Sequence, residues 1–252
     1  MALRYAARNM PAKSHARSAS DKRKGVKHLH DKVSHRLGLA IIRGELKPGE
    51  LFPNEDDHSV QLGVGRSVYR EAVRFLAAKG LVEGRRRRGT LVLPRGRWNF
   101  LDPDVLGWFF EVNPDAAFIR DLMQLRLIIE PAAAELAARH RTPLDLEQMR
   151  EALAAMHAAP FASPAGREAG SRFHRAVLQA TGNEVMSSLS SSIDAAVRWT
   201  LTYMKRRHAA IPDPFGSHER LYRAIENQDT AAARDLMRSI VGDAYEAAQN
   251  RR

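Results

Sequence analysis

The chain has 252 residues, 44% of them hydrophobic and 27% charged, which is typical of a soluble globular protein with one large or two modest domains. It has no cysteine, no apolar run near the roughly 20 residues of a membrane span, and no apolar stretch in residues 1–20. These features exclude disulfides and thiolate chemistry, argue against a membrane partner and a secretory signal, and favour a cytoplasmic protein. The net charge of +11 arises in residues 1–97, which hold 22 Lys and Arg against 9 Asp and Glu, whereas residues 98–252 hold 18 against 20.

The basic N-terminal part predicts a polyanion partner, because lysines and arginines that neutralise phosphates release condensed counterions. Residues 1–27 are rich in Ala, Ser, Lys and Arg with little periodicity, and we expect a flexible basic arm there. A solubility tail would explain this arm, but not the arginines inside the ordered-looking segments that follow. The first such segment runs from Asp31 to Gly44 and is predicted to be a helix. Its apolar face comprises Val33, Leu37, Ala40 and Ile41.

Two further helices are predicted after this segment. A short helix follows Asn54, which is suited to cap it, and a Gly-containing turn over residues 62–65 precedes a third helix over residues 66–79. Gly80 is placed to end the third helix in a left-handed conformation. The inward face of this helix is expected to comprise Tyr69, Ala72, Val73 and Leu76.

A basic hairpin is predicted next. Two short β-prone runs, residues 81–83 and 90–93, flank a Gly-bounded segment of four arginines at residues 84–89. Three helices followed by such a hairpin predict a winged helix-turn-helix domain over residues 28–97. Residues 98–113 then form a connector that is too rich in aromatic residues for a free linker. We expect it, together with Phe75, to contribute to contacts between domains or subunits.

From residue 114 to residue 252 the apolar pattern is almost continuously helical. Six amphipathic stripes are separated by Pro or Gly, near Pro143, Pro160, Gly182 and Pro212. An antiparallel bundle of about six helices would bury these stripes. The predicted fold is therefore mainly α, with an N-terminal winged helix-turn-helix domain and a C-terminal all-helical domain.

The chain resembles the GntR family of regulators. Residues 64–82 resemble its recognition helix, and residues 46–53 and 88–90 match the same family at the same spacing. The C-terminal part resembles the FCD-type helical effector domain of the FadR subfamily, with signatures at residues 125–131, 173–176 and 218–225. The connector looks most like that of regulators of galactonate-type sugar-acid catabolism. The resemblance implies a transcriptional regulator rather than an enzyme, and we find no nucleophile–base pair.

The resemblance implies a DNA-binding surface on the third helix and the wing. Donors at the N-terminal end of a recognition helix reach the major groove, and arginine there reads guanine or clamps phosphate. A solvated helix face is the alternative interpretation of these arginines. Asp56 and Asp57 stand where relatives often place a DNA-contacting arginine, which puts a contact from the second helix in doubt. The expected DNA-binding residues are Arg66, Ser67, Arg70, Arg74, Arg86, Arg87, Arg88, Gly89 and Thr90.

Relatives often hold a divalent metal with an Asp, a His four residues later, and two further histidines. Here His174 and His218 match two of these positions, whereas Gly170 and Ile240 stand at the others. Two imidazoles make a poor site for Zn or Ni unless a ligand or water completes it. We therefore expect no required cofactor. The alternatives are a metal-dependent enzyme or metal-gated sensor that uses His174 and His218, or two polar residues satisfied within a bundle.

Arg126 lies on or beside the apolar stripe of the first bundle helix. A salt bridge to Glu130, one turn away, would satisfy its charge; alternatively its guanidinium binds an effector carboxylate, as the resemblance favours. Arg198 is a weaker candidate of the same kind. The expected effector-binding residues are Arg126, His174, Arg198 and His218. We predict a homodimeric repressor that binds an inverted-repeat operator and is released from it by a small carboxylate, such as a sugar acid.

Overall fold

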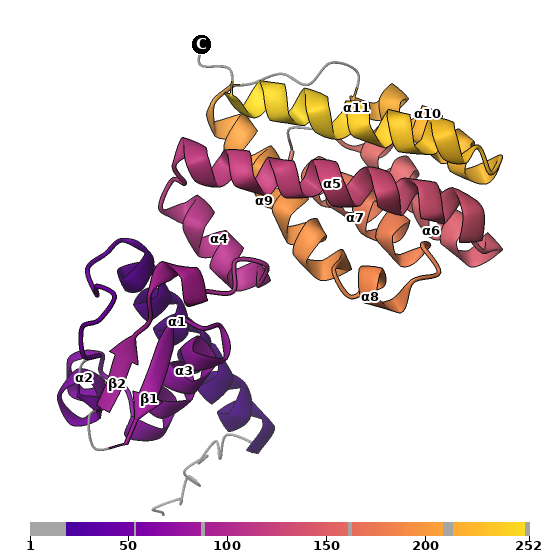
Figure 1. The fold of residues 1–252 in the computed structure, drawn as a ribbon. Coiled ribbons are helices and arrows are strands. Elements are labelled where there is room, and N and C mark those ends of the chain that lie inside the picture. The colour runs from indigo at the N-terminus through magenta and orange to yellow at the C-terminus, as the bar shows by residue number, and fades with distance from the viewer. Residues whose placement is uncertain (1–18, 53, 87–88, 161–162, 209–213, 250–252) are drawn as a thin grey trace, which may run out of the picture.

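The computed structural model describes residues 19–52, 54–86, 89–160, 163–208 and 214–249. It comprises an N-terminal domain with three helices and a two-stranded hairpin, and a bundle of longer helices (Figure 1). A further helix, α4, lies between these two parts. This arrangement confirms the predicted fold class.

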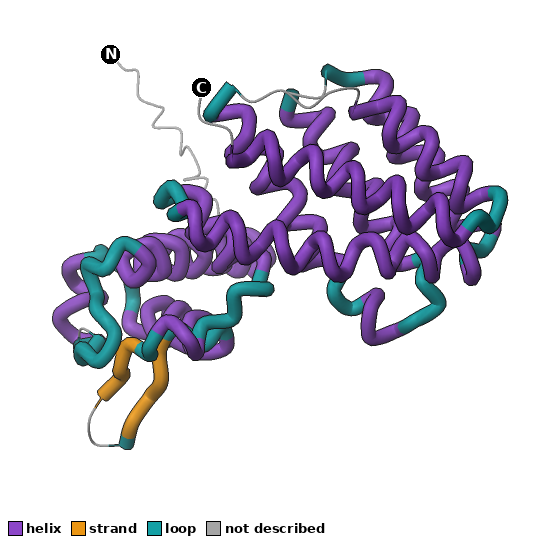
Figure 2. Tube along the Cα trace, turned by 45° about the horizontal axis from the view of Figure 1, so that its top comes forward, coloured by secondary structure: helices purple, strands orange, loops and turns teal. Residues whose placement is uncertain are grey.

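The N-terminal domain is built from five elements. They are α1 (Ala19–Ile42), α2 (Glu55–Gln61), α3 (Arg66–Ala78), β1 (Val82–Arg85) and β2 (Gly89–Val92). Helix α1 packs on α3, and the two strands project from the domain away from the bundle (Figure 2). The strands are antiparallel, with Val82 opposite Val92 and Arg85 opposite Gly89. The predicted hairpin is therefore confirmed, with its first strand extended into the arginine run.

The first helix corrects one boundary. It begins at Ala19, inside the segment expected to be a flexible arm, and not near Asp31. Residues 19–27 are mostly Ala, Ser, Lys and Arg, which are acceptable in helices, and a helix nucleated by the buried face further on extends at little cost. Apolar periodicity finds only the packed part of such a helix. The rest of the expected arm, residues 1–18, lies outside the described residues.

Local chemistry explains the boundaries of α2 and α3. The side-chain oxygen of Asn54 accepts a hydrogen bond from the Asp56 N–H at 3.4 Å, as expected for an N-cap. Gly80 ends α3 with φ +74°, and a Cβ there would lie 2.3 Å from the Arg97 carbonyl oxygen, so only glycine fits. Tyr69, Ala72 and Leu76 are buried as predicted, whereas Val73 is half-buried. Val68 is also buried, which widens the inward face by one position.

The connector is largely helical. After η1 (Arg95–Arg97), α4 spans Pro103–Glu111, and the Asp102 side chain caps it by accepting hydrogen bonds from two backbone N–H groups. The periodicity of α4 is hidden in the sequence because residues 105–110 are all buried. The helix packs on α1 and on α9, so the aromatic connector joins the two domains as expected. Its aromatic side chains pack on one another and on rings of the bundle, among them Phe118 and Trp199.

The bundle contains six longer helices and one short helix among its described residues. These are α5 (Ala116–His140), α6 (Pro143–Ala158), α7 (Pro164–Gln179), α8 (Glu184–Ser187), α9 (Ser190–Arg206), α10 (Pro214–Glu226) and α11 (Thr230–Gln249). Helix α5 lies along α11, and α7 lies between α6 and α9 (Figure 1). The core that they enclose positions the polar residues described below.

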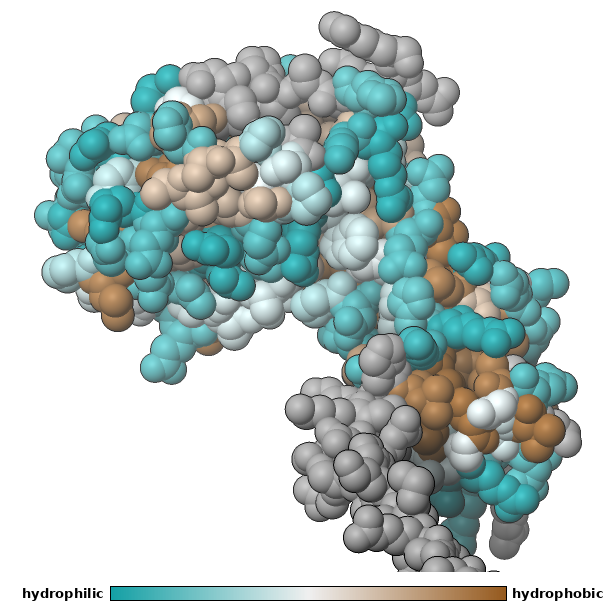
Figure 3. All heavy atoms as spheres, turned by 180° about the vertical axis from the view of Figure 1, so that it is seen from behind, coloured by the Kyte–Doolittle hydropathy of each residue, from teal (hydrophilic) through white to brown (hydrophobic). Residues whose placement is uncertain are grey.

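The outer surface differs between the two parts of the molecule. On the face seen in Figure 3, hydrophobic residues gather over the N-terminal domain and the neck, whereas the bundle is mainly hydrophilic. Within the ranges that the structure describes, no helix has both the length and the apolar character that crossing a bilayer requires.

Candidate nucleic-acid interface and effector site

The exposed face of α3 carries the arginines that the sequence singles out. Arg66, Arg70 and Arg74 are four residues apart, so they form one row along the helix, and each side chain is well exposed. Ser67 is exposed beside Arg66, whereas Tyr69 faces the core. The helix therefore presents a row of three exposed arginines, which suits a helix that reads a DNA groove.

The wing adds further exposed groups near this face. Arg86 is exposed where the chain leaves β1, and Gly89 is exposed with φ +83° at the start of β2. Thr90 is half-buried, and its carbonyl oxygen accepts a hydrogen bond from the Phe52 N–H at 2.7 Å. This bond holds the loop-side end of β2 against the chain that leads to α2. Arg87 and Arg88, also expected to bind DNA, lie outside the described residues.

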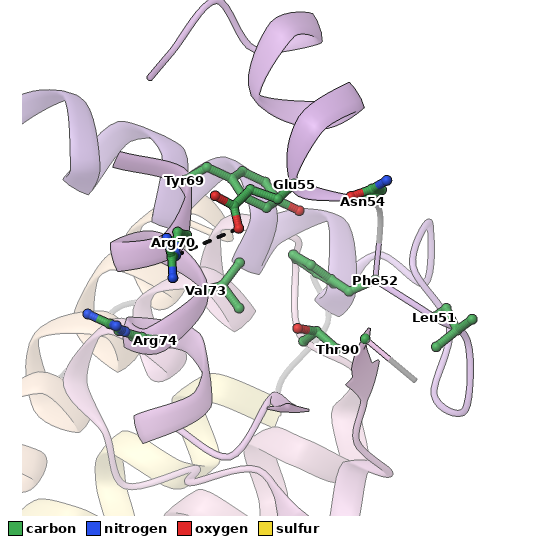
Figure 4. Close-up of a pocket in the computed structure, with 10 residues that line it drawn as sticks. Leu51, Phe52, Asn54, Glu55, Tyr69, Arg70, Val73, Arg74 and Thr90 are labelled. Carbon is green, nitrogen blue, oxygen red and sulfur yellow. Dashed lines mark ion pairs between the residues drawn. The ribbon is translucent and has the colours of Figure 1, made fainter. Parts of the chain in front are cut away.

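A concavity of about 770 Å³ lies between α2, α3 and the first residues of β2 (Figure 4). Its walls include Phe52, Tyr69 and Val73, and Arg70 and Arg74 stand at its edge. Burial, followed by the negative charge of Glu55, raises the pKa of Tyr69 to about 12, so its hydroxyl stays neutral. The concavity thus joins an apolar floor to a cationic rim, next to the helix that is expected to enter DNA.

Carboxylates accompany the arginines of α3. Asp56 Oδ1 lies 3.0 Å from Arg66 Nε, and Glu55 Oε2 lies 3.7 Å from Arg70 Nε. Both carboxylates come from α2, and the second pair is marked in Figure 4. Sequence reasoning noted Asp56 only as a departure from relatives and did not single out Glu55. A signal was available, since both directly follow the cap residue of a helix that must pack on α3.

A second polar site lies inside the bundle, where four charged or polar side chains meet. Arg126, Glu130, His174 and His218 come from α5, α7 and α10, and each is at least 95% buried. Arg126 Nε donates to Glu130 Oε1 at 2.5 Å, and the other Glu130 oxygen pairs with His174 Nδ1. His174 Nε2 lies 3.3 Å from His218 Nε2. We call these four residues the buried cluster.

Glu130 is the electrostatic centre of the buried cluster. Its burial opposes ionisation, but the charges of Arg126 and His174, and hydrogen bonds from both, outweigh this and lower the pKa of Glu130 to about 2. The carboxylate therefore stays charged and holds a proton on His174 Nδ1. When His174 is neutral, its Nε2 presents a lone pair toward His218. The sequence suggested Glu130 only as a partner of Arg126, because its approach to α7 depends on tertiary packing.

Arg198 does not join the buried cluster. Its side chain is 42% exposed and pairs with Glu168 at 3.5 Å and Asp194 at 3.8 Å. The reason is helical phase, because residue 200 rather than 198 faces inward on α9. Thr200 is fully buried, and its hydroxyl donates a hydrogen bond to the Ala196 carbonyl oxygen at 2.7 Å. The same hydroxyl lies 3.9 Å from Met123 Sδ, which Arg126 Nη1 approaches to 3.7 Å. Sequence reasoning missed Thr200, which is a buried polar residue of α9, as are Ser190 and Asp194.

The donor set of the buried cluster does not suit a divalent metal. His174 and His218 direct Nε2 toward each other, but Glu130 meets His174 on the opposite side of its ring. Gly170 and Ile240, at the remaining two positions, have no ligating side chain. In the described part of the chain, no group of three or more His, Cys, Asp or Glu is placed to hold a metal ion. Two nitrogens fall short of the three or four protein ligands of a usual site.

The helix between the domains links the two sites. On α1, Gly38 lies under the Trp108 ring of α4, and on the bundle side Gly107 of α4 lies against the Trp199 ring of α9. Trp199 is next to Thr200 in the chain, so α9 contacts both α4 and the surroundings of the buried cluster. Arg206 adds a hydrogen bond of 2.9 Å to the Phe110 carbonyl oxygen. Helix α4 is therefore packed between α1 of the DNA-binding domain and α9 of the bundle.

Comparison with known proteins identifies two families along the chain. Residues 29–92 match the family described as "Bacterial regulatory proteins, gntR family", and residues 121–243 match the "FCD domain". The chain is 36% identical over 213 residues to the galactonate operon transcriptional repressor of Escherichia coli, covering 84% of this chain and 93% of that protein. It is 28% identical over 202 residues to the transcriptional regulator LutR of Bacillus subtilis, covering 78% and 90%.

A solved structure supports the same fold. It is described as "Lar controls the expression of the Listeria monocytogenes agr system and mediates virulence", and it aligns with a TM-score of 0.60 at 20% identity, covering 87% of this chain and 96% of that one. The identity to the Escherichia coli repressor over most of both chains shows the family. The chain belongs to the GntR family and is a transcriptional regulator with a helix-turn-helix domain and an FCD effector domain, not an enzyme.

Proposed function

We propose that this regulator is a repressor that leaves its operator when a small carboxylate, of the sugar-acid class, binds at the buried cluster. The observation that carries the proposal is Arg126, a cation that is 2% exposed inside a helical bundle. It is linked through Glu130 to His174, which in turn lies next to His218. The similar Escherichia coli protein is named for the galactonate operon, and galactonate is a sugar acid. A repressor of bacterial genes acts on DNA in the cytoplasm, which is the compartment that the proposal implies.

The chemistry of the cluster suits a carboxylate. A guanidinium binds carboxylate oxygens in a planar fork, and the proximity of His174 and His218 offers imidazole donors on the other side. Because the metal-ligand set is incomplete, we propose that protein donors hold the effector directly, without a cofactor. The hydroxyl groups of a sugar acid would then be accommodated by polar neighbours such as Thr200.

We also propose that the protein works as a homodimer on an inverted repeat, because one winged domain reads too few base pairs for a unique site. The aromatic side chains of the connector pack within the chain, and Lys79 Nζ lies 4.1 Å from the centre of the Phe75 ring. We therefore propose a different surface for the contact between subunits. Helix α5 offers one. Ile128 on its outer face is 72% exposed, and it is flanked by the half-buried residues Leu125 and Ile129.

The switch would operate through α9 and α4. An effector that displaces groups beside Thr200 would shift Trp199, whose ring contacts Gly107 of α4. Trp108, also on α4, contacts Gly38 of the DNA-binding domain. In a dimer, a small rotation of each winged domain changes the distance between the two recognition helices. By linkage, DNA must weaken effector binding by the same factor, typically 5- to 150-fold.

The proposal is tested with an operator obtained by in vitro selection from random duplexes. Fluorescence anisotropy then measures operator release against a panel of sugar acids and dicarboxylates, with inorganic phosphate as a control for general anion effects. Release by one carboxylate, with unchanged affinity in the presence of phosphate, is expected. The proposal would be overturned if no carboxylate in the panel changed the affinity for the operator.

A further inference from the structure

The two ion pairs between α2 and α3 share a detail that bears on how DNA is read. In both, the carboxylate faces Nε of the arginine: Asp56 faces Arg66 and Glu55 faces Arg70. By contrast, Arg74 pairs through its terminal Nη1 with Glu71 of its own helix. The guanidinium nitrogen recorded nearest to each carboxylate is thus Nε, and not either of the two terminal nitrogens. Those two nitrogens are the pair that binds O6 and N7 of guanine.

We propose that Asp56 and Glu55 are specificity-determining residues that position Arg66 and Arg70 to read guanine and weaken contact with non-cognate DNA. Each carboxylate lies at the Nε edge of one guanidinium on the exposed face of α3, and this would favour orientations in which the terminal fork is turned toward an approaching base. A guanine at the matching position accepts both terminal donors while the carboxylate remains paired. Binding guanine therefore does not require the arginine to give up its ion pair with the carboxylate.

Non-cognate DNA meets the same surface differently. Binding without base contacts depends on phosphates, and a phosphate close to Arg66 or Arg70 also lies close to Asp56 or Glu55. Two negative charges on this face therefore oppose the phosphate backbone, even though residues 1–97 as a whole are strongly basic. The pairs themselves are exposed, so they add little to stability, about 0.2–1 kcal/mol in typical proteins. Their main effect is on the ratio of the affinities for cognate and random DNA.

The position of the pairs supports this assignment. Arg70 and Glu55 both line the concavity between α2, α3 and the wing, and Figure 4 shows their side chains directed toward each other at its edge. Arg66 is the first residue of α3, where a recognition helix meets base edges. The two acidic residues thus lie beside the groove-reading end of the helix and not on the remote side of the domain.

The test compares the full-length protein with its Asp56→Asn and Glu55→Gln variants. The selected operator and a random duplex are titrated by anisotropy at several salt concentrations. Each variant is expected to bind random DNA more tightly, with a steeper salt dependence, and to lose about fivefold or more in the ratio of cognate to random affinity. Asp56→Glu, which keeps the charge at this position, should retain most of the discrimination.

Glu219→Gln is the matched control, because it removes one carboxylate from an exposed arginine pair on α10, remote from the DNA-binding domain. It should leave the affinity ratio unchanged. Repeating the selection with Asp56→Asn adds a readout that loss of structure would not produce: the preference for guanine should relax at one position of each half-site. An unchanged affinity ratio in both variants, whether the two affinities rise together or stay constant, would overturn the proposal.

Discussion

Trp108 of α4 packs over Gly38 of α1 so closely that a Cβ on residue 38 would lie 2.5 Å from the indole ring. This contact joins the DNA-binding domain to the connector helix. Gly38→Ala should therefore displace the buried indole and lower the free energy of unfolding by about 1–3 kcal/mol. It should also weaken effector-driven release of DNA more than it weakens DNA binding itself. Chemical denaturation and anisotropy with and without effector measure the two effects.

Gly242→Ala provides the comparison, because nothing lies within 4 Å of a Cβ at that position of α11. Alanine should be neutral there or stabilise by up to about 1 kcal/mol through helix propensity. Equal responses from the two alanine variants would show that the Trp108 contact is not what couples the domains.

Arg126 provides the test of the effector site. Arg126→Lys keeps a cation beside Glu130 but removes the planar fork, so the affinity for a carboxylate effector should fall about tenfold or more while the fold is retained. Arg198→Lys, on the outer side of α9, should bind the effector as wild type does. Calorimetry before and after exhaustive chelation completes the experiment. Affinity that returns only when zinc or nickel is added, or an Arg126 variant that releases DNA at the wild-type effector concentration, would contradict the assignment.

The low pKa of Glu130 predicts acid sensitivity. A carboxyl group that titrates near 2 in the folded state, but near its ordinary value of 4.5 when unfolded, stabilises the fold fully above pH 4.5. This contribution, on the order of 3 kcal/mol, is lost as the pH falls from 4.5 toward 2. Urea unfolding at fixed protein concentration should show a shallower decline with pH in Glu130→Gln than in wild type. Glu147→Gln, at an exposed carboxylate, should keep a decline close to that of wild type.

Arginines of α3 are expected to read bases, whereas arginines of the wing are expected to bind phosphates, so their variants should differ. Arg70→Ala should cost about 1–3 kcal/mol with the selected operator and relax specificity, because a base contact is lost. Arg86→Ala, at the wing, should weaken binding to cognate and random duplexes alike and reduce the salt slope by about one unit. Anisotropy titrations with both duplexes across salt distinguish the two patterns. Identical profiles for the two variants would argue against this division of roles.

The exposed face of α5 predicts where subunits meet. Ile128→Asp should shift the protein toward monomer and weaken operator binding, because it places a charge in an apolar contact. Leu144→Asp is a suitable control, since Leu144 is also exposed, at 67%, but lies on α6. Sedimentation velocity at micromolar concentration gives the oligomeric state. A wild-type monomer, with and without DNA, would refute the dimer itself.

Much of the DNA-binding domain was predictable because its signals are local. The apolar period of α3, the cap at Asn54 and the positive φ of Gly80 each depend on a few neighbouring residues. Helix α4 was not predictable in the same way, because apolar residues surround it on all sides and erase the period. Part of α1 was missed for the opposite reason: its first turns carry no apolar face.

The buried cluster shows the same limit. The pairing of Arg126 with Glu130 follows from their spacing on one helix, and the sequence suggested it. The meeting of Glu130 with His174 joins residues 44 apart, and it follows from how α5 packs on α7. Arg198 was misplaced because the orientation of α9 could not be inferred from one charged residue between two apolar ones.

The charge balance of the buried cluster has a consequence for the proposed effector. The guanidinium of Arg126 is already paired with Glu130, so a carboxylate that enters meets a cation whose charge is balanced before it arrives. The entering carboxylate and Glu130 would therefore share or compete for one guanidinium, so that effector binding works against an existing internal ion pair. The strength of that pair would set the lowest effector concentration to which the regulator responds.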